Sequence, residues 1–195
     1  MLHTVVSQLR ETPLLEWLAF VFGVAQVVLA WQNKSSNFVA GLLSVLLYTY
    51  LFYTNGLYAE SVLNAYYVLI SIIGLWMWKR QIVAEKPIKY CNKNEWVFAF
   101  AICVLLIIGL SFILSAFTNS TVPVPDALVS ALAWTGAYLL VQRKLENWLW
   151  LSASNLLAIP LLLYKNMPLT ALLTVIYLVV GILAYRTWRT LATKQ

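Results

Sequence analysis

Charged residues are scarce in this sequence. Asp, Glu, Lys and Arg make up 10% of its 195 residues, whereas 62% are hydrophobic and the mean hydropathy is +0.80. Soluble domains carry about 25% charged residues, so a chain this poor in charge cannot cover a surface that faces water. The composition excludes a soluble enzyme, a nucleic-acid-binding domain and a disordered chain, and it predicts an all-α polytopic membrane protein.

Residues that bind metals or act as nucleophiles are also few. His3 is the one histidine, and Cys91 and Cys103 are the two cysteines. Their spacing matches no metal site, and their places in a basic loop and in an apolar run do not predict a disulfide. The sequence also lacks the glycine loop of ATP-binding proteins and the GxSxG and HExxH motifs of hydrolases. We therefore expect no cofactor, no metal and no enzymatic activity.

Long apolar runs fill most of the chain. A helix needs about 20 mostly apolar residues to cross a bilayer. Seven runs approach that length, at residues 14–32, 38–54, 58–78, 96–118, 126–142, 148–164 and 168–188. Lys and Arg divide 2 against 11 between the two sides that these spans define, with Arg10 and Lys165 on the poorer side. Because cytoplasmic loops are rich in Lys and Arg, we expect an outside N-terminus and a cytoplasmic C-terminus.

The chain contains an internal repeat. Residues 13–78 align without a gap on residues 123–188, at an offset of 110, with matches at proline, glutamine, lysine, asparagine, tyrosine and tryptophan. Each copy holds three spans, and the single span 96–118 between them returns the chain to the starting side. The sequence therefore predicts one membrane domain over residues 1–195, with seven helices in a 3+1+3 arrangement of parallel repeats that resembles full-length SWEET carriers.

Polar residues inside the spans mark a candidate pathway. The third span carries one helical stripe made of Glu60, Asn64, Tyr67 and Ser71. The repeat places Thr170, Thr174, Tyr177 and Gly181 at the equivalent positions of the seventh span. Polar groups are costly in hydrocarbon, so two related stripes indicate a wet path between the triplets. Hydrogen bonding that only joins helices is the alternative. The residues assigned to the pathway or a gate are Glu60, Ser71, Trp150 and Thr174.

Amide and aromatic side chains at mid-depth form a candidate substrate pocket. Amides bind hydroxyls and ring nitrogens, and aromatic faces stack on flat rings and attract cations. Such a set suits a small, planar, neutral or cationic solute, although helix packing explains each residue equally well when it is taken alone. The expected pocket residues are Gln26, Tyr48, Asn64, Tyr67, Trp134, Asn155 and Tyr177.

Acids and tryptophans near the span ends are expected to have structural roles. Glu16 and Asp126 hold equivalent positions in the repeat, and each could attract a cation or cap a helix N-terminus, of which we favour capping. No acid lies deep in a span, so facilitated diffusion by alternating access is the simplest mechanism. Tryptophans near the span ends are expected to anchor the helices at the membrane interface. These are Trp17, Trp31, Trp76, Trp78, Trp96, Trp148 and Trp188.

Several segments of the chain resemble a known family. They are Gly56-Leu57-Tyr58-Ala59-Glu60, the segment from Tyr67 through Gly74 to Trp78, and Lys144-Leu145-Glu146-Asn147-Trp148 with Asn155. In order and spacing they are similar to the Pnu-type vitamin transporters, whose best-known members carry nicotinamide riboside. The resemblance covers nearly the whole chain, and it implies a seven-helix fold in the bacterial cytoplasmic membrane.

The resemblance also implies a function. Members of the family import an unphosphorylated vitamin by facilitated diffusion, and a cytoplasmic kinase then traps it by phosphorylation. Nicotinamide riboside is the first expectation, thiamine is the alternative within the family, and a sugar carrier or a membrane enzyme is more distant. The family's substrate site is lined by Trp, Asn and Gln side chains, which fits Gln26, Asn64, Trp134 and Asn155. The expected partners are the vitamin, the lipid bilayer and the kinase, with a homo-oligomer left open and no nucleic acid.

Overall fold

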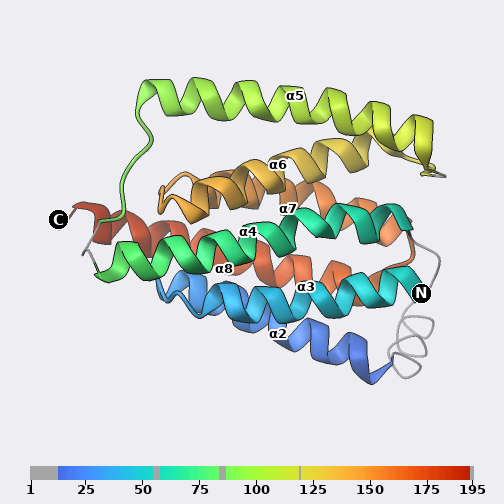
Figure 1. Cartoon of the computed structure of the whole chain (residues 1–195), viewed down its shortest axis with the longest axis horizontal. Helices are drawn as coiled ribbons and strands as arrows, with labels where there is room; N and C mark the ends of the chain where they lie inside the picture. Colours follow the sequence, from blue (N-terminus) through green and yellow to red (C-terminus); the bar gives the residue numbers. More distant parts are fainter. Residues whose placement is uncertain (1–12, 55–57, 84–86, 119, 194–195) are drawn as a thin grey trace.

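In the described part of this computed structural model, seven long helices lie side by side (Figure 1). The structure describes residues 13–54, 58–83, 87–118 and 120–193, without the side chains of residues 58–60, 62–63 and 81–83. The helices are α2 (Leu14–Trp31), α3 (Asn37–Thr54), α4 (Tyr58–Val83), α5 (Lys93–Phe117), α6 (Pro123–Val141), α7 (Asn147–Tyr164) and α8 (Pro168–Thr193). The expected all-α class with seven helices is confirmed.

Among the described residues, five helices are long and apolar enough by themselves to cross a membrane: α2, α3, α5, α6 and α8. The other two, α4 and α7, run alongside them (Figure 1). These two carry Asn64, Ser71 and Asn155, and Ser71 is buried. Both helices therefore place polar side chains of the expected pathway and pocket among the helices of the bundle.

Six of the helices form a closed ring. Each helix contacts the next in the order α2, α3, α4, α6, α7 and α8, and α8 contacts α2 again. The linker helix α5 packs on α6 and lies outside the ring (Figure 1). The triplet α2–α4 and the triplet α6–α8 therefore meet along two interfaces, α4 with α6 and α2 with α8. This is the 3+1+3 arrangement, and it leaves the space between the triplets as the natural route along the bundle.

The same local contacts recur in both triplets at the offset of 110 residues. The Ser44 hydroxyl donates to the Ala19 carbonyl at 2.8 Å, and the Ser154 hydroxyl donates to the Val129 carbonyl at 2.8 Å. The turn after the first helix of each triplet also passes through a left-handed residue, Asn33 with φ 56° and Arg143 with φ 58°. Equivalent residues thus make equivalent bonds, although the exact limits of the repeats, 13–78 and 123–188, and of the linker span 96–118 stay a prediction.

The end of the molecule that holds the chain's C-terminus is rich in Lys and Arg, and we call it the basic end (Figure 1). A compact aromatic core closes this end. Trp78 and Trp188 have no exposed surface and Trp148 is 2% exposed, so the prediction that these three anchor the membrane interface is wrong. They sit at span ends as expected, but they face neighbouring helices. Trp76, in contrast, is 56% exposed and remains available to lipid.

The aromatic core has the symmetry of the repeat. Phe38 meets Trp78 edge to face, with ring centres 5.1 Å apart, and the equivalent Trp148 meets Trp188 in the same way at 5.5 Å. Edge-to-face pairs are a favoured aromatic geometry. Each pair joins the second and third helices of one triplet, so each triplet is stiffened at the basic end by its own ring pair.

The loop before α5 is fixed to the second triplet. Lys89 exchanges backbone hydrogen bonds with Arg143 and Leu145, and the Cys91 amide donates to the Glu146 carboxylate at 2.8 Å. Lys144 forms a 2.6 Å ion pair with Glu95 in the first turn of α5. Burial, with the Glu146 carboxylate beside it, raises the pKa of the Cys91 thiol to about 12, so this thiol stays protonated at neutral pH. The linker helix is therefore attached to the α6–α7 connection.

The close approach of Phe38 to α4 yields the first prediction. A side chain at position 74 would meet the Phe38 ring, so Gly74→Ala should push that ring away from Trp78. Overpacking of a core typically costs about 1–3 kcal/mol. We expect the thermal unfolding midpoint of the purified protein in detergent to fall.

Gly109→Ala on α5 is the matched control, because a Cβ at position 109 meets no atom within 4 Å. Its midpoint should be unchanged or raised, since alanine is a better helix former than glycine. An equal fall in both variants would contradict the packing explanation.

Candidate functional site

A group of tyrosines lies at mid-depth where the triplets meet. Tyr177 of α8 is close enough to Tyr48 of α3 and to Tyr67 of α4 for their phenol groups to interact electrostatically. The Tyr177 hydroxyl reaches α2 and would lie 2.6 Å from a Cβ at position 23, so glycine at that position admits it. Tyr67 and Tyr177 are equivalent in the repeat. The structure thus brings together three of the seven residues that the sequence predicted for the pocket.

Trp134 of α6 joins the same region through Tyr66 of α4. The two rings stack with centres 4.4 Å apart and planes 19° apart, and the Tyr66 hydroxyl donates to the Trp134 carbonyl at 2.8 Å. Tyr66 and Tyr67 are in ring contact at 5.6 Å. Trp134 therefore belongs to an aromatic cluster with Tyr48, Tyr66, Tyr67 and Tyr177, which we call the central cluster.

Sequence reasoning missed Tyr66. The repeat places Ile176 at the equivalent position, so a search for matching polar residues in both copies cannot find it. The only available signal was its position next to Tyr67 in the chain. It is nevertheless the residue that connects α4 to Trp134 across the boundary between the triplets.

Two side chains of the central cluster carry buried polar atoms without a partner. The Tyr48 hydroxyl lies beside Thr170 but completes no hydrogen bond of ordinary geometry, and the Trp134 indole nitrogen makes none. An unsatisfied buried donor costs about 1–3 kcal/mol, so most buried polar groups in proteins are paired. Two orphan donors within one aromatic cluster are what a site for a polar, flat ligand requires.

Two predicted amides lie on α2 and α7, the two ring helices that supply no residue to the central cluster. The Gln26 amide of α2 packs on Gly41 of α3, where its carbon would lie 2.8 Å from a Cβ. In the second triplet the large and small residues of this contact are exchanged. Gly136 stands at the position of Gln26, and Leu151 stands at the position of Gly41 and packs on it. Asn155 of α7 is half-buried. Gln26 thus fills the α2–α3 contact within the first triplet.

The remaining predicted residues fall into different surroundings. Asn64 is half-buried, and Ser71 is buried on the face of α4 that carries Tyr67. The Thr174 hydroxyl donates a hydrogen bond to the Thr170 carbonyl of its own helix at 2.8 Å.

Trp150 faces the linker helix α5 and points away from the central cluster. Its ring lies 5.0 Å from the Phe100 ring and 6.1 Å from the Trp96 ring. The side chain of Glu60 lies outside the described residues.

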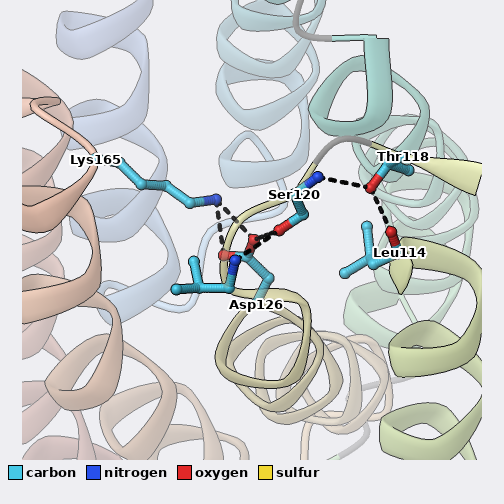
Figure 2. Close-up of polar contacts among 6 residues, drawn as sticks. Leu114, Thr118, Ser120, Asp126 and Lys165 are labelled. Atoms are coloured by element: carbon cyan, nitrogen blue, oxygen red, sulfur yellow. Dashed lines mark hydrogen bonds and ion pairs between the residues drawn. The ribbon is translucent and has the colours of Figure 1, made fainter. Parts of the chain in front are cut away.

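Asp126 binds a cation, which was the alternative to the favoured prediction of helix capping. The N-terminus of α6, with Val122 as its N-cap residue, has no side-chain capping hydrogen bond. Instead both Asp126 carboxylate oxygens lie 2.8 Å from the Lys165 ammonium, and one also accepts from the Ser120 hydroxyl at 2.8 Å (Figure 2). The same figure shows Thr118 bonded to the Leu114 carbonyl and to the Ser120 amide. Asp126 therefore ties the α5–α6 connection to the α7–α8 connection. Glu16 lies in the first turn of α2, which also has no side-chain cap.

The fold and the central cluster define a helical membrane transporter built from two repeated triplets. A family model described as nicotinamide mononucleotide transporter matches residues 13–190, and the chain belongs to this family. The family and the relatives below are transporters, so the chain is a transporter and not an enzyme.

Two relatives and one solved structure are similar over most of their lengths. The nicotinamide riboside transporter PnuC of Neisseria mucosa is 30% identical over 200 residues, which are 92% of this chain and 74% of that protein. PnuC of Escherichia coli K12 is 22% identical over 201 residues, which are 89% and 84% of the two chains. The crystal structure of the vitamin B3 transporter PnuC matches with a TM-score of 0.80 and 28% identity, covering 99% of this chain and 88% of the other.

The Asp126–Lys165 pair yields a prediction for stability. The side chains are 12% and 21% exposed, respectively, so water screens the pair only in part. Hydrogen bonds to charged groups contribute about 1.5–3 kcal/mol. In a double-mutant cycle of Asp126→Asn and Lys165→Met, we expect the double variant to lose less stability than the sum of the single variants. Thermal unfolding in detergent measures this, and strictly additive losses would show that the two groups are not coupled.

Proposed function

We propose that this chain carries nicotinamide riboside across the cytoplasmic membrane by facilitated diffusion. The observation that carries the proposal is the central cluster, where the Trp134 indole nitrogen has no hydrogen-bond partner and the Tyr48 hydroxyl, beside Thr170, completes no hydrogen bond of ordinary geometry. Nicotinamide riboside has a flat cationic ring and a sugar with hydroxyl groups. Aromatic faces attract cations and stack on flat rings, while free O–H and N–H donors suit the sugar and the amide. The names of the similar transporters support the same vitamin.

The charges of the bundle favour the riboside over its phosphorylated form. A phosphate monoester carries a charge of about −1.5 to −2 at pH 7, and burying it needs a cationic partner. On the described parts of the ring helices, the Lys and Arg side chains belong to the final turns of α4 and α8. They are Lys79, Arg80, Arg186 and Arg189. The central cluster is aromatic and carries no cationic side chain, so it suits a cationic nucleoside better than a nucleotide.

The distribution of acids supports uniport. Among the described side chains, the four carboxylates belong to helix ends and loops. They are Glu16, Glu95, Asp126 and Glu146. A proton relay needs an ionisable group within the membrane path, and the central cluster offers tyrosines, a tryptophan and hydroxyls. Alternating access then consists of the two triplets rocking about the central cluster, with the solute moving down its own gradient.

The same reasoning extends to location and partners. The basic end faces the cytoplasm and the N-terminus faces outward, because Lys and Arg concentrate at the basic end. The membrane is the bacterial cytoplasmic membrane. A cytoplasmic kinase completes uptake, since phosphorylation adds the charge that the pathway does not accommodate. Assembly into a homo-oligomer stays a prediction.

Uptake into proteoliposomes tests the proposal. With identical buffer on both sides and no ion gradient, labelled nicotinamide riboside should equilibrate. Excess unlabelled riboside should compete, and nicotinamide mononucleotide should compete weakly because of its phosphate. Uptake of labelled thiamine without uptake of the riboside would show that thiamine is the substrate instead. Flux that strictly needs a sodium or proton gradient would contradict uniport, and sugar flux without vitamin flux would contradict the substrate class.

Tyr48→Phe separates substrate binding from stability. The Tyr48 hydroxyl makes no hydrogen bond of ordinary geometry within the protein, so its removal should leave the thermal unfolding midpoint unchanged or raised. If the hydroxyl binds the solute, the half-saturating concentration should rise about threefold to tenfold, as expected for the loss of one hydrogen bond.

Two other tyrosines serve as controls for Tyr48→Phe. Tyr50→Phe changes a side chain that is 57% exposed, so it should alter neither the thermal unfolding midpoint nor the half-saturating concentration. Tyr66→Phe removes the bond to the Trp134 carbonyl and should lower stability. An unchanged half-saturating concentration in Tyr48→Phe would remove this hydroxyl from the site.

A further inference from the structure

Trp78 and Trp188 meet on the axis that relates the two triplets. They are equivalent in the repeat, one at the end of α4 and the other at the end of α8, and their ring centres are 6.0 Å apart. Two equivalent residues in contact must lie on either side of the axis between the halves. Neither ring has exposed surface. A solute that moves along this axis toward the basic end therefore meets these two rings.

Both indoles also bond across the boundary. The Trp78 indole N–H donates to the Leu140 and Val141 carbonyls at 3.1 Å, and the Trp188 indole N–H donates to the Trp31 carbonyl at 3.1 Å. Positions 31 and 141 are equivalent, so each triplet supplies a tryptophan to the last turn of the other triplet's first helix. Carbonyls of a last helical turn have no partner within the helix. The Val141 and Trp31 carbonyls are acceptors of this kind, whereas the Leu140 carbonyl also accepts from the Arg143 amide.

Two further contacts strengthen this boundary. The Trp31 indole donates to the Thr187 hydroxyl at 2.8 Å, which adds a second bond between α2 and α8. The Arg143 guanidinium lies 5.4 Å from the centre of the Trp78 ring, within the range of a cation–π contact between the triplets. In contrast, the contacts of Phe38 with Trp78 and of Trp148 with Trp188 lie within one triplet each.

The tryptophan pair lies below the central cluster on the same helix faces. Eleven residues separate Tyr67 from Trp78 and Tyr177 from Trp188, which is about three helical turns, or roughly 16 Å. Ser71 and Gly181 occupy the equivalent positions between them, and both are buried. One continuous face of each third helix thus runs from the central cluster to the tryptophan pair.

We propose that Trp78 and Trp188 form the gate of the pathway at the basic end, and that this structure holds the gate closed. The proposal deepens the transport function above and rests on it. Each tryptophan is held within its own triplet by a ring contact, so the rings move with the triplets as rigid parts. Opening then consists of breaking the indole–carbonyl bonds between the triplets, with no rearrangement inside either one.

The accessibility of a cysteine above the gate tests the proposal. Ser71→Cys, in a background with Cys91→Ser and Cys103→Ser, places a thiol between the central cluster and the tryptophan pair. In membrane vesicles of known orientation, an impermeant maleimide is added from the side of the basic end. Phenylalanine keeps an aromatic ring but donates no hydrogen bond, so Trp78→Phe with Trp188→Phe should speed labelling about tenfold.

Trp76→Phe is the matched control, because Trp76 lies at the same end of α4 and is exposed. It should leave the labelling rate unchanged. Thr187→Val, which removes the acceptor of the Trp31 indole and keeps the side-chain volume, should give a smaller increase than the tryptophan pair. Each single tryptophan variant should label at a rate between those of the reference and the double variant. The single variants therefore decide the test if the double variant fails to fold.

The labelling result is independent of the vitamin. The assay contains no solute, so failure to transport nicotinamide riboside would contradict the proposed function and leave the gate intact. Rapid labelling of Ser71→Cys from the basic end with both tryptophans present would overturn the gate. Unchanged labelling in the double variant would overturn it as well.

Discussion

The two triplets exchange indole hydrogen bonds at one end of the bundle, and the rest of the arrangement depends on that exchange. Helix ends in a membrane leave carbonyls that need partners. Each triplet satisfies such a carbonyl of its counterpart through Trp78 or Trp188. Because the bonds are reciprocal, they hold the two triplets together at this end of the bundle. The same pairing also turns Tyr67 and Tyr177 toward one another, since they lie on the same faces of α4 and α8 as the two tryptophans.

Much of the fold was predictable because the membrane imposes it. Apolar runs of sufficient length give the helices, and a repeat of 66 residues with one span left over gives the 3+1+3 arrangement. The buried tryptophans were not predicted, because position at a span end does not reveal which face of the helix a residue occupies. The stripe that contains Tyr67 and Ser71 continues to Trp78, and extending it by two turns would have placed that ring inside.

The candidate site was predictable where both copies of the repeat carry the same chemistry. Tyr67 and Tyr177 match, and the structure places them close together. Tyr66 and Lys165 were missed because their roles depend on contacts between residues far apart in sequence, with Trp134 and Asp126 respectively. Gln26 was predicted from its depth and from the family resemblance, and Trp150 from its depth. Their neighbours, Gly41 for one and Phe100 for the other, are determined by how helices pack and cannot be obtained from depth.

The linker helix makes the two halves unequal partners. It packs on α6, and the loop before it is bonded to the α6–α7 connection through Lys89 and Glu146. The second half therefore has four helices, one of which presents an almost entirely apolar surface, while the first half has three. Because this apolar surface adds contact with lipid, we expect the four-helix body to move less in the bilayer than the three-helix body when the two halves tilt.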